Sequence, residues 1–237
     1  MSVGVIAPWG GNCPHRQAAW EWVQGWYAQN HPDWDVVQGV CSSERWCKAE
    51  AVADGLRKTD ADILVIADAD VVADDMGATV RQIQRGIKRW AIPHLRVHRL
   101  SQGATVRILA GERPNQVAKT LDDYDQPPYR GMSGGGAVVL SREIYMDVPL
   151  DPGFTGWGQE DQSWAIALKA VHGNPWRSAN GPLWHLWHPP QKRLTREKGS
   201  QQSWNLYRSY CRAAGSRSAA HGLLRAGRAL VERGPQA

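Results

Sequence analysis

The chain has 237 residues, of which 42% are hydrophobic and 22% charged, with a formal net charge of +5. This composition is that of a globular protein and excludes a disordered, fibrous or coiled-coil one. No apolar run approaches the ~20 residues of a membrane span, and no basic region with a long apolar stretch opens the chain, so neither an anchor nor a signal peptide is expected. We therefore expect a cytoplasmic protein whose four cysteines are reduced.

The first ninety residues alternate between strand-like and helix-like patterns. Ile63–Ala67 is a continuous apolar run, which is typical of a parallel strand covered on both faces. This β-α-β-α-β-α opening predicts a doubly wound α/β fold. The expected strands are Val3–Ala7, Trp34–Val40 and Ile63–Ala67, and the expected helices are His15–Gln29, Trp46–Leu56 and Asp74–Trp90.

The pattern is weaker after Pro93. Periodicity there still separates strand-like segments from helical ones, and the tail is expected to form one or two helices. The expected strands are His94–Leu100, Thr105–Leu109 and Ala137–Leu140, with a short strand or loop at Trp184–Pro190; the expected helices are Ser141–Val148 and Gln159–Val171.

Charge is concentrated in the tail. Residues 192–237 contain ten Lys or Arg and two Asp or Glu, a net charge of +8, so the preceding 191 residues carry −3. Such asymmetry suggests contact with a polyanion or an acidic surface. A solvated helical face explains the charge equally well.

An acidic motif, Asp68-Ala69-Asp70, directly follows the apolar strand Ile63–Ala67. In open α/β sheets, ligands bind beyond the carboxyl ends of the strands. Two carboxylates at this spacing can share Mg²⁺ or Mn²⁺ with the phosphates of a ligand. The alternative is a solvated turn, but the position at the end of a buried strand favours the metal.

A second motif, Gly156-Trp157-Gly158-Gln159-Glu160-Asp161, precedes a predicted helix. Its glycines allow the backbone to approach a ligand, and its tryptophan can stack on a sugar face. Carboxylates in a first helical turn are also favoured by capping and by the helix dipole, which is the structural alternative. We favour a functional role because of the preceding Gly-Trp-Gly loop.

A third motif, Trp184-His185-Leu186-Trp187-His188, places two histidines three residues apart. Either imidazole could bind a cation held by Asp70. A histidine among aromatic residues is more often a core residue with satisfied hydrogen bonds. The metal interpretation therefore depends on the other two motifs.

Together and in this order, the motifs resemble the nucleotide-sugar glycosyltransferases of the GT-A fold, in the branch of the β-1,4-galactosyltransferases and polypeptide N-acetylgalactosaminyltransferases. The likeness spans roughly residues 3–190. It implies a GT-A catalytic domain, a Rossmann-like, doubly wound mixed sheet, over residues 1–195, with a basic helical extension over 196–237. The small, unanchored form resembles bacterial or bacteriophage members, and a phage enzyme would act in the host cytoplasm.

The resemblance also implies which residues bind the donor. Pro8 and Arg16 would border the nucleotide, while Gly135, Gly136 and Trp157 would line the sugar pocket. One departure is Pro8-Trp9-Gly10, where that branch has Pro-x-Arg. The implied donor-binding residues are Pro8, Arg16, Lys48, Asp68, Gly135, Gly136 and Trp157.

For metal binding and catalysis, the resemblance implies that Asp70 and His188 ligate Mn²⁺ or Mg²⁺, with His185 at the spacing of a second ligand. Asp161 would be the catalytic base, and Glu160 would bind donor or acceptor hydroxyls. Retaining relatives replace the second acid of this pair by Asn, so Asp161 favours inversion at the anomeric carbon.

The predicted activity is transfer of a sugar from a UDP-sugar to a hydroxyl acceptor. A polypeptide, a glycan, a lipid-linked sugar and a modified DNA base all stay open as acceptors. A nucleotidyltransferase would show a basic, glycine-rich loop after the first strand, and Pro8–Gly11 contains no Lys or Arg. A non-catalytic sugar- or nucleic-acid-binding module would explain the thirteen tryptophans and the basic tail, but not the ordered acidic motifs.

Overall fold

The computed structural model describes residues 1–190 and 200–232. Within residues 1–190, a six-stranded sheet has the order β2-β1-β3-β8-β5-β9. Strand β1 is parallel to β2 and β3, whereas β8 is antiparallel to β3, so the mixed α/β sheet expected from the sequence is confirmed. Its strands are β1 (Val3–Trp9), β2 (Asp35–Val40), β3 (Ile63–Ala67), β5 (Trp90–Ile92), β8 (Ala137–Ser141) and β9 (Trp176–Arg177).

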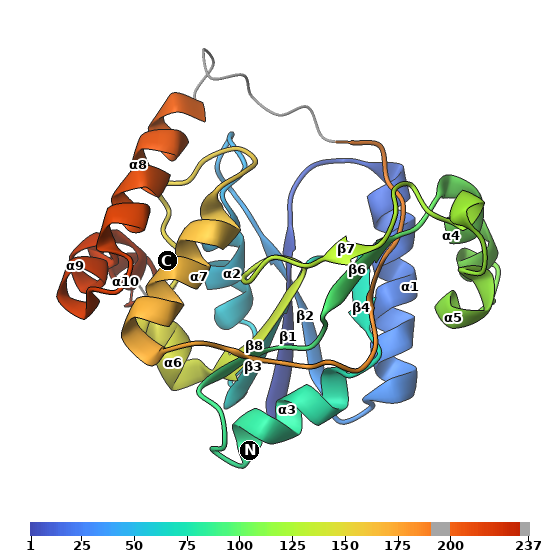
Figure 1. Cartoon of the computed structure of the whole chain (residues 1–237), viewed down its shortest axis with the longest axis horizontal. Helices are drawn as coiled ribbons and strands as arrows, with labels where there is room; N and C mark the ends of the chain where they lie inside the picture. The colour runs from blue at the N-terminus through green and yellow to red at the C-terminus, as the bar shows by residue number, and fades with distance from the viewer. Residues whose placement is uncertain (191–199, 233–237) are drawn as a thin grey trace.

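Both faces of this sheet are covered, because successive residues of β3 point to opposite sides. Ile63 and Val65 pack into one apolar cluster with α1 and α3, while Leu64 and Ile66 pack into another with α2, α6 and α7. Figure 1 shows these helices on either side of the central strands. The helices are α1 (Pro14–Asn30), α2 (Lys48–Leu56), α3 (Met76–Gln84), α6 (Arg142–Asp147) and α7 (Glu160–His172).

A smaller, four-stranded sheet has the order β4-β10-β6-β7. Strand β10 pairs with β4, which directly follows the acidic motif, and sets His185 opposite Val71. The backbone N–H of Leu186 then donates to the carbonyl of Asp70 at 2.9 Å. This pairing brings the histidine motif to the carboxyl end of β3. The strands are β4 (Val71–Ala73), β6 (Arg96–Arg99), β7 (Tyr129–Arg130) and β10 (Leu183–His185).

Two predicted elements differ in the structure. Thr105–Leu109, expected as a strand, lies in helix α4 (Gln102–Leu109), which a short helix α5 (Pro114–Val117) follows. The Ser101 hydroxyl accepts from the N–H of Ala104 and caps α4. The predicted helix Asp74–Trp90 ends at Gln84 in α3, because Gly86 adopts a φ of 65° and Trp90 starts β5.

The described part of the tail forms three helices where one or two were expected, namely α8 (Ser200–Ala213), α9 (Arg217–Leu223) and α10 (Arg225–Glu232). They pack against α7, α2 and α6, and Tyr210 is buried with its hydroxyl donating to Asp151 at 2.8 Å. The remaining tail residues of the predicted extension, 196–199 and 233–237, lie outside the described residues. No helix among the described residues has the length and apolar character needed to cross a membrane.

The contact between α10 and the domain depends on a glycine. A Cβ added at Gly227 would lie 2.5 Å from the Leu150 carbonyl oxygen, whereas one added at Gly222 in α9 would meet nothing within 4 Å. We expect Gly227→Ala to lower the free energy of unfolding by about 1–3 kcal/mol through overpacking. Gly222→Ala should raise it by about 0.5–1 kcal/mol. Urea unfolding of both variants checks this, and equal effects would show that α10 is not seated closely on the domain.

Candidate active site

The three sequence motifs meet in one cavity of about 320 Å³ at the carboxyl end of the central strands. It is lined by ten of the twelve residues predicted to form the site. Segments more than a hundred residues apart in the sequence therefore face the same space. The ten residues are Pro8, Arg16, Lys48, Asp68, Asp70, Trp157, Glu160, Asp161, His185 and His188.

Asp70, His185 and His188 offer one ligand atom each within 4.8 Å of one another. His188 Nε2 lies 3.3 Å from Asp70 Oδ2, and His185 Nε2 lies 3.8 Å from Asp70 Oδ1. Burial lowers the pKa of His185, which favours the neutral imidazole that binds metals. Two imidazoles and a carboxylate suit a first-row divalent metal such as Mn²⁺ better than Mg²⁺, which prefers oxygen ligands.

Arg16 holds Asp70 from the other side. Its Nε donates to Asp70 Oδ2 at 3.1 Å, and the two side chains are 5% and 3% exposed. Burial works to raise the pKa of Asp70, but the neighbouring histidines and Arg16 hold it below its ordinary value. Asp70 is therefore ionised, as a metal ligand must be.

Lys48, the first residue of α2, connects the Asp-Ala-Asp motif after β3 with the Gly-Trp-Gly-Gln-Glu-Asp motif before α7. Its Nζ lies 2.9 Å from Asp68 Oδ1 and 2.9 Å from Asp161 Oδ1, and its side chain is 7% exposed. Burial alone would lower the pKa of Lys48, but the charges of Asp161 and Asp68 outweigh it and raise the pKa. A buried ammonium group thus ties the end of β3 to the start of α7.

The second carboxylate oxygen of Asp161, Oδ2, lies beside the glycine loop that precedes β8. A Cβ on Gly135 would lie 3.3 Å from Asp161 Oδ2, and one on Gly134 would lie 2.2 Å from the Asp161 carbonyl oxygen. Glycines therefore allow the loop before β8 to pass close to α7. Burial raises the pKa of Asp161, with Lys48 acting against it.

The two glycines predicted to line the sugar pocket, Gly135 and Gly136, have different surroundings. Gly135 borders Asp161, although it does not line the cavity. Gly136 has a φ of 74°, and a Cβ there would lie 2.5 Å from Leu183 Cδ2 in β10. Gly136 thus permits the two sheets to pack together at this point.

Glu160 is turned back towards the loop before it. Its Oε2 accepts from the N–H of Gly158 at 2.9 Å, and the residue is 8% exposed. Burial, followed by the charge of Asp161, raises the pKa of Glu160 to about 7. The preceding Gln159 has a φ of 71°, a strained conformation of the kind found at functional sites. Glu160 thus orders the Gly-Trp-Gly loop.

Aromatic rings form one wall of the cavity. Trp157 stacks on Trp46 with ring centroids 5.2 Å apart, and the Arg16 guanidinium lies 5.4 Å from the Trp157 ring and 5.6 Å from the Trp9 ring. A Cβ on Gly10 would lie 2.3 Å from the Trp46 ring, so a glycine is required there. The wall offers a flat apolar face beside the metal ligands.

Sequence reasoning missed several lining residues. Trp46 stood at the start of a predicted helix, with nothing to relate it to Trp157 far along the chain. Arg99 lies on β6, where its Nε donates to the Tyr129 hydroxyl at 3.1 Å, and a single arginine in a predicted strand carries no functional signal. The residues missed are Trp46, Arg99, Met132, Gln162 and Pro190, whereas Gly158 and Gln159 belong to the second predicted motif.

Neither a protein-family model nor a curated protein matches the chain. Solved structures similar to it include Drosophila β1,4-galactosyltransferase 7, crystallised as a mutant with manganese, UDP-Gal and xylobiose. That match has 11% identity and a TM-score of 0.48, covering 85% of this chain and 79% of the other. Another is glucosyl-3-phosphoglycerate synthase from Mycobacterium tuberculosis with Mn²⁺, UDP-glucose and phosphoglyceric acid, at 13% identity and a TM-score of 0.45, covering 94% and 80%. Both neighbours are glycosyltransferases.

Proposed function

We propose that this protein is a metal-dependent glycosyltransferase of the GT-A type, which transfers a sugar from a UDP-sugar to an acceptor hydroxyl with inversion. One observation carries the proposal: a single cavity holds a group of metal-ligating side chains and, beside it, a carboxylate positioned by a buried lysine. Diphosphate binding and proton removal, the two tasks of glycosyl transfer, thus have residues in the same space.

The donor would lie between the metal ligands and the aromatic wall. Mn²⁺ held by Asp70, His185 and His188 would neutralise the charge that develops on the departing diphosphate. Arg16 adds a fixed positive charge at the same place, and Trp157, whose ring lies 5.4 Å from the Arg16 guanidinium, would border the sugar. Pro8, Lys48 and Asp68 complete the donor side of the cavity.

The transfer would be one displacement. The acceptor oxygen forms a bond to the anomeric carbon while its proton passes to Asp161 Oδ2, since Oδ1 is bound to Lys48. The bond between the anomeric carbon and the diphosphate oxygen breaks, and its electron pair leaves with UDP. Attack opposite the leaving group inverts the configuration.

The sequence leaves a polypeptide, a glycan, a lipid-linked sugar or a modified DNA base open as the acceptor, and it suggests that the basic tail attracts an anionic acceptor or partner. Four tail arginines, Arg208, Arg212, Arg217 and Arg225, are exposed and would be available for such contacts. All three helices of the described tail pack on the preceding helices, which limits this role to their outer faces.

Metal-dependent UDP binding is the direct test of the proposal. We expect calorimetry to show UDP binding with Mn²⁺, at least tenfold weaker binding with Mg²⁺, and loss of binding in EDTA, because two of the three ligands are imidazoles. Asp70→Asn and His185→Gln should abolish the effect of Mn²⁺, while Asp33→Asn on the surface should not change it. Equal UDP affinity with Mn²⁺ and with EDTA would overturn the proposed function.

A further inference from the structure

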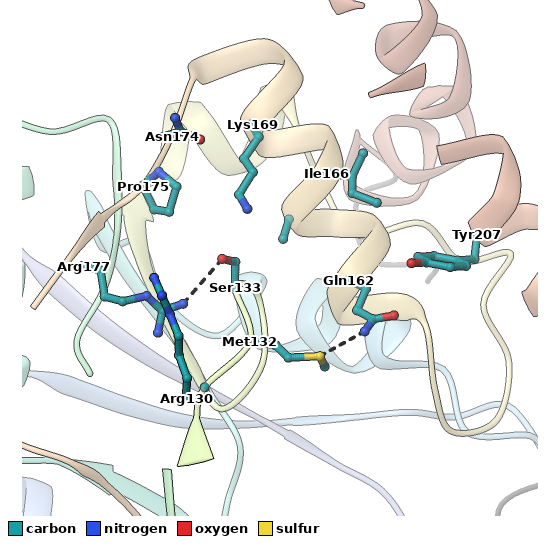
Figure 2. Close-up of a pocket in the computed structure, with 12 residues that line it drawn as sticks. Arg130, Met132, Ser133, Gln162, Ile166, Lys169, Asn174, Pro175, Arg177 and Tyr207 are labelled. Carbon is teal, nitrogen blue, oxygen red and sulfur yellow. Dashed lines mark hydrogen bonds between the residues drawn. The ribbon is translucent and has the colours of Figure 1, made fainter. Parts of the chain in front are cut away.

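A second cavity, of about 550 Å³, lies beside the candidate active site. Figure 2 shows it between helix α7, the loop after β7 and strand β9. Met132 and Gln162 line both cavities. Its volume is within the range of small-molecule sites, and none of the roles assigned above uses it.

The second cavity is positively charged. Arg130 of β7, Lys169 of α7 and Arg177 of β9 line it, and no Asp or Glu of residues 1–190 or 200–232 does. Throughout the described ranges, none of these three side chains forms an ion pair with a carboxylate. Three cations from three separate elements therefore face one space without a counter-ion from the described part of the chain.

Arg177 is held in place by hydrogen bonds rather than by charge. Its guanidinium donates to the His94 carbonyl at 2.9 Å and to the Ser133 hydroxyl at 3.4 Å. Figure 2 shows Arg130 beside it, on the same side of the cavity. Burial, followed by the charge of Arg130, lowers the pKa of Arg177. Two adjacent guanidinium groups repel each other, and a bound anion would relieve that repulsion.

Two side chains, Met132 and Gln162, line both this cavity and the one that holds the candidate base. The amide Nε2 of Gln162 lies 3.0 Å from the Met132 sulfur, a contact drawn in Figure 2. Gln162 directly follows Asp161, and Met132 is 50% exposed. A ligand that extends from the cationic cavity to Asp161 must therefore displace this contact, which the exposed Met132 side chain allows.

We propose that the cationic cavity binds the phosphate of a small phosphorylated acceptor and thereby presents an acceptor hydroxyl to Asp161. Its role as an acceptor site rests on the proposed glycosyltransferase function. Arg130, Lys169 and Arg177 supply the charge for a phosphate dianion, and Ser133 and Asn174 offer hydrogen bonds to a polyhydroxylated body. The phosphate is unchanged in the reaction, in which only the hydroxyl exchanges its proton for the sugar.

Binding of inorganic phosphate tests the cavity without any UDP-sugar. EDTA in the calorimetry removes any metal ion through which phosphate could bind at the active site. We expect the double variant Arg130→Gln, Lys169→Gln to bind phosphate at least tenfold more weakly than the wild type. The matched double variant Arg85→Gln, Lys119→Gln removes the same charge from exposed positions outside the cavity and should bind like the wild type. Equal affinity in the two double variants, or displacement of phosphate by excess UDP, would overturn the proposal.

Acceptor kinetics test the role of the cavity in the reaction. Matched compounds, such as glucose 6-phosphate with glucose and glycerol 3-phosphate with glycerol, should differ in UDP release, with the phosphorylated member preferred. The cavity variant should raise the KM for that member at least tenfold, with a smaller change in kcat. Preference for the neutral members would contradict the proposal. So would inhibition of the reaction by a single-stranded oligonucleotide but not by small phosphates, since that result would indicate a nucleic-acid site. Metal-dependent UDP binding is measured separately, so failure of the proposed function is distinguishable from failure of this inference.

Discussion

Asp161→Asn should lower kcat by about 10²–10⁴-fold while leaving the affinity for UDP unchanged. A hydroxyl is a weak nucleophile at neutral pH, and in the proposed mechanism its proton passes to Asp161 Oδ2 while Lys48 holds Oδ1 at 2.9 Å. An asparagine oxygen can still accept the hydrogen bond from Lys48, so the geometry of α7 should be kept. Steady-state UDP release measures kcat, and NMR of the product should show the anomeric configuration opposite to that of the donor.

The alternative is that Asp161 only stabilises the first turn of α7. In that case Asp161→Asn would cost about 1 kcal/mol of unfolding free energy and change the rate little. The exposed Asp33→Asn serves as the control for loss of one carboxylate. Near-normal turnover of Asp161→Asn, or a product with retained configuration, would contradict the assignment of Asp161 as the base.

Glu160 gives a pH dependence that can be measured without substrate. Burial raises its folded-state pKa to about 7, whereas an unfolded chain has an ordinary carboxyl pKa. The folded state therefore binds the additional proton, and the stability from this proton is full below about pH 4 and is lost as the pH rises to about 7. Between pH 4.5 and 8, wild type should lose on the order of 2 kcal/mol relative to Glu160→Gln in urea unfolding. Parallel pH profiles for the two proteins would show that Glu160 is not perturbed.

Much of the site could be predicted because its residues follow strand ends and helix starts. Asp68 and Asp70 follow an apolar strand, and Asp161 follows a glycine loop, so their places at one edge of the sheet depended only on the α/β order. The placing of His185 and His188 in the site had weaker support from the sequence. Their place beside Asp70 depends on β10 pairing with β4, a contact between segments 110 residues apart that no local pattern indicates.

What could not be predicted depended on tertiary contacts. Thr105–Leu109 has β-branched residues typical of a strand, but the Ser101 cap and burial of Ala104 and Ile108 on one side make it a helix. Likewise, Arg130, Lys169 and Arg177 are single charges in three separate elements, and only the packing of α7 against the sheet brings them to one cavity.

Lys48→Met should lower the free energy of unfolding by about 3 kcal/mol at pH 8, because it leaves two carboxylates facing each other without their cation. The full cost of a broken buried pair is reduced here, since Asp68 and Asp161 keep 32% and 21% of their side-chain surface exposed. Methionine fills a similar volume, so the loss reports charge rather than a cavity. Urea unfolding at pH 8 measures it, with the exposed Lys119→Met as the control.

The pH dependence of this loss separates charge from packing. Without Lys48, which opposes the effect of burial, the folded-state pKa of Asp161 rises further above its unfolded value. A raised carboxyl pKa gives stability below about pH 4 that is lost as the pH rises, so the gap between wild type and Lys48→Met should widen from pH 4.5 to pH 8. Adding Asp161→Asn to Lys48→Met should recover part of the lost stability, because only Asp68 then lacks a partner. A gap that is constant with pH and unaffected by the second substitution would mean that Lys48 acts through packing, and that the carboxylates beside it do not depend on its charge.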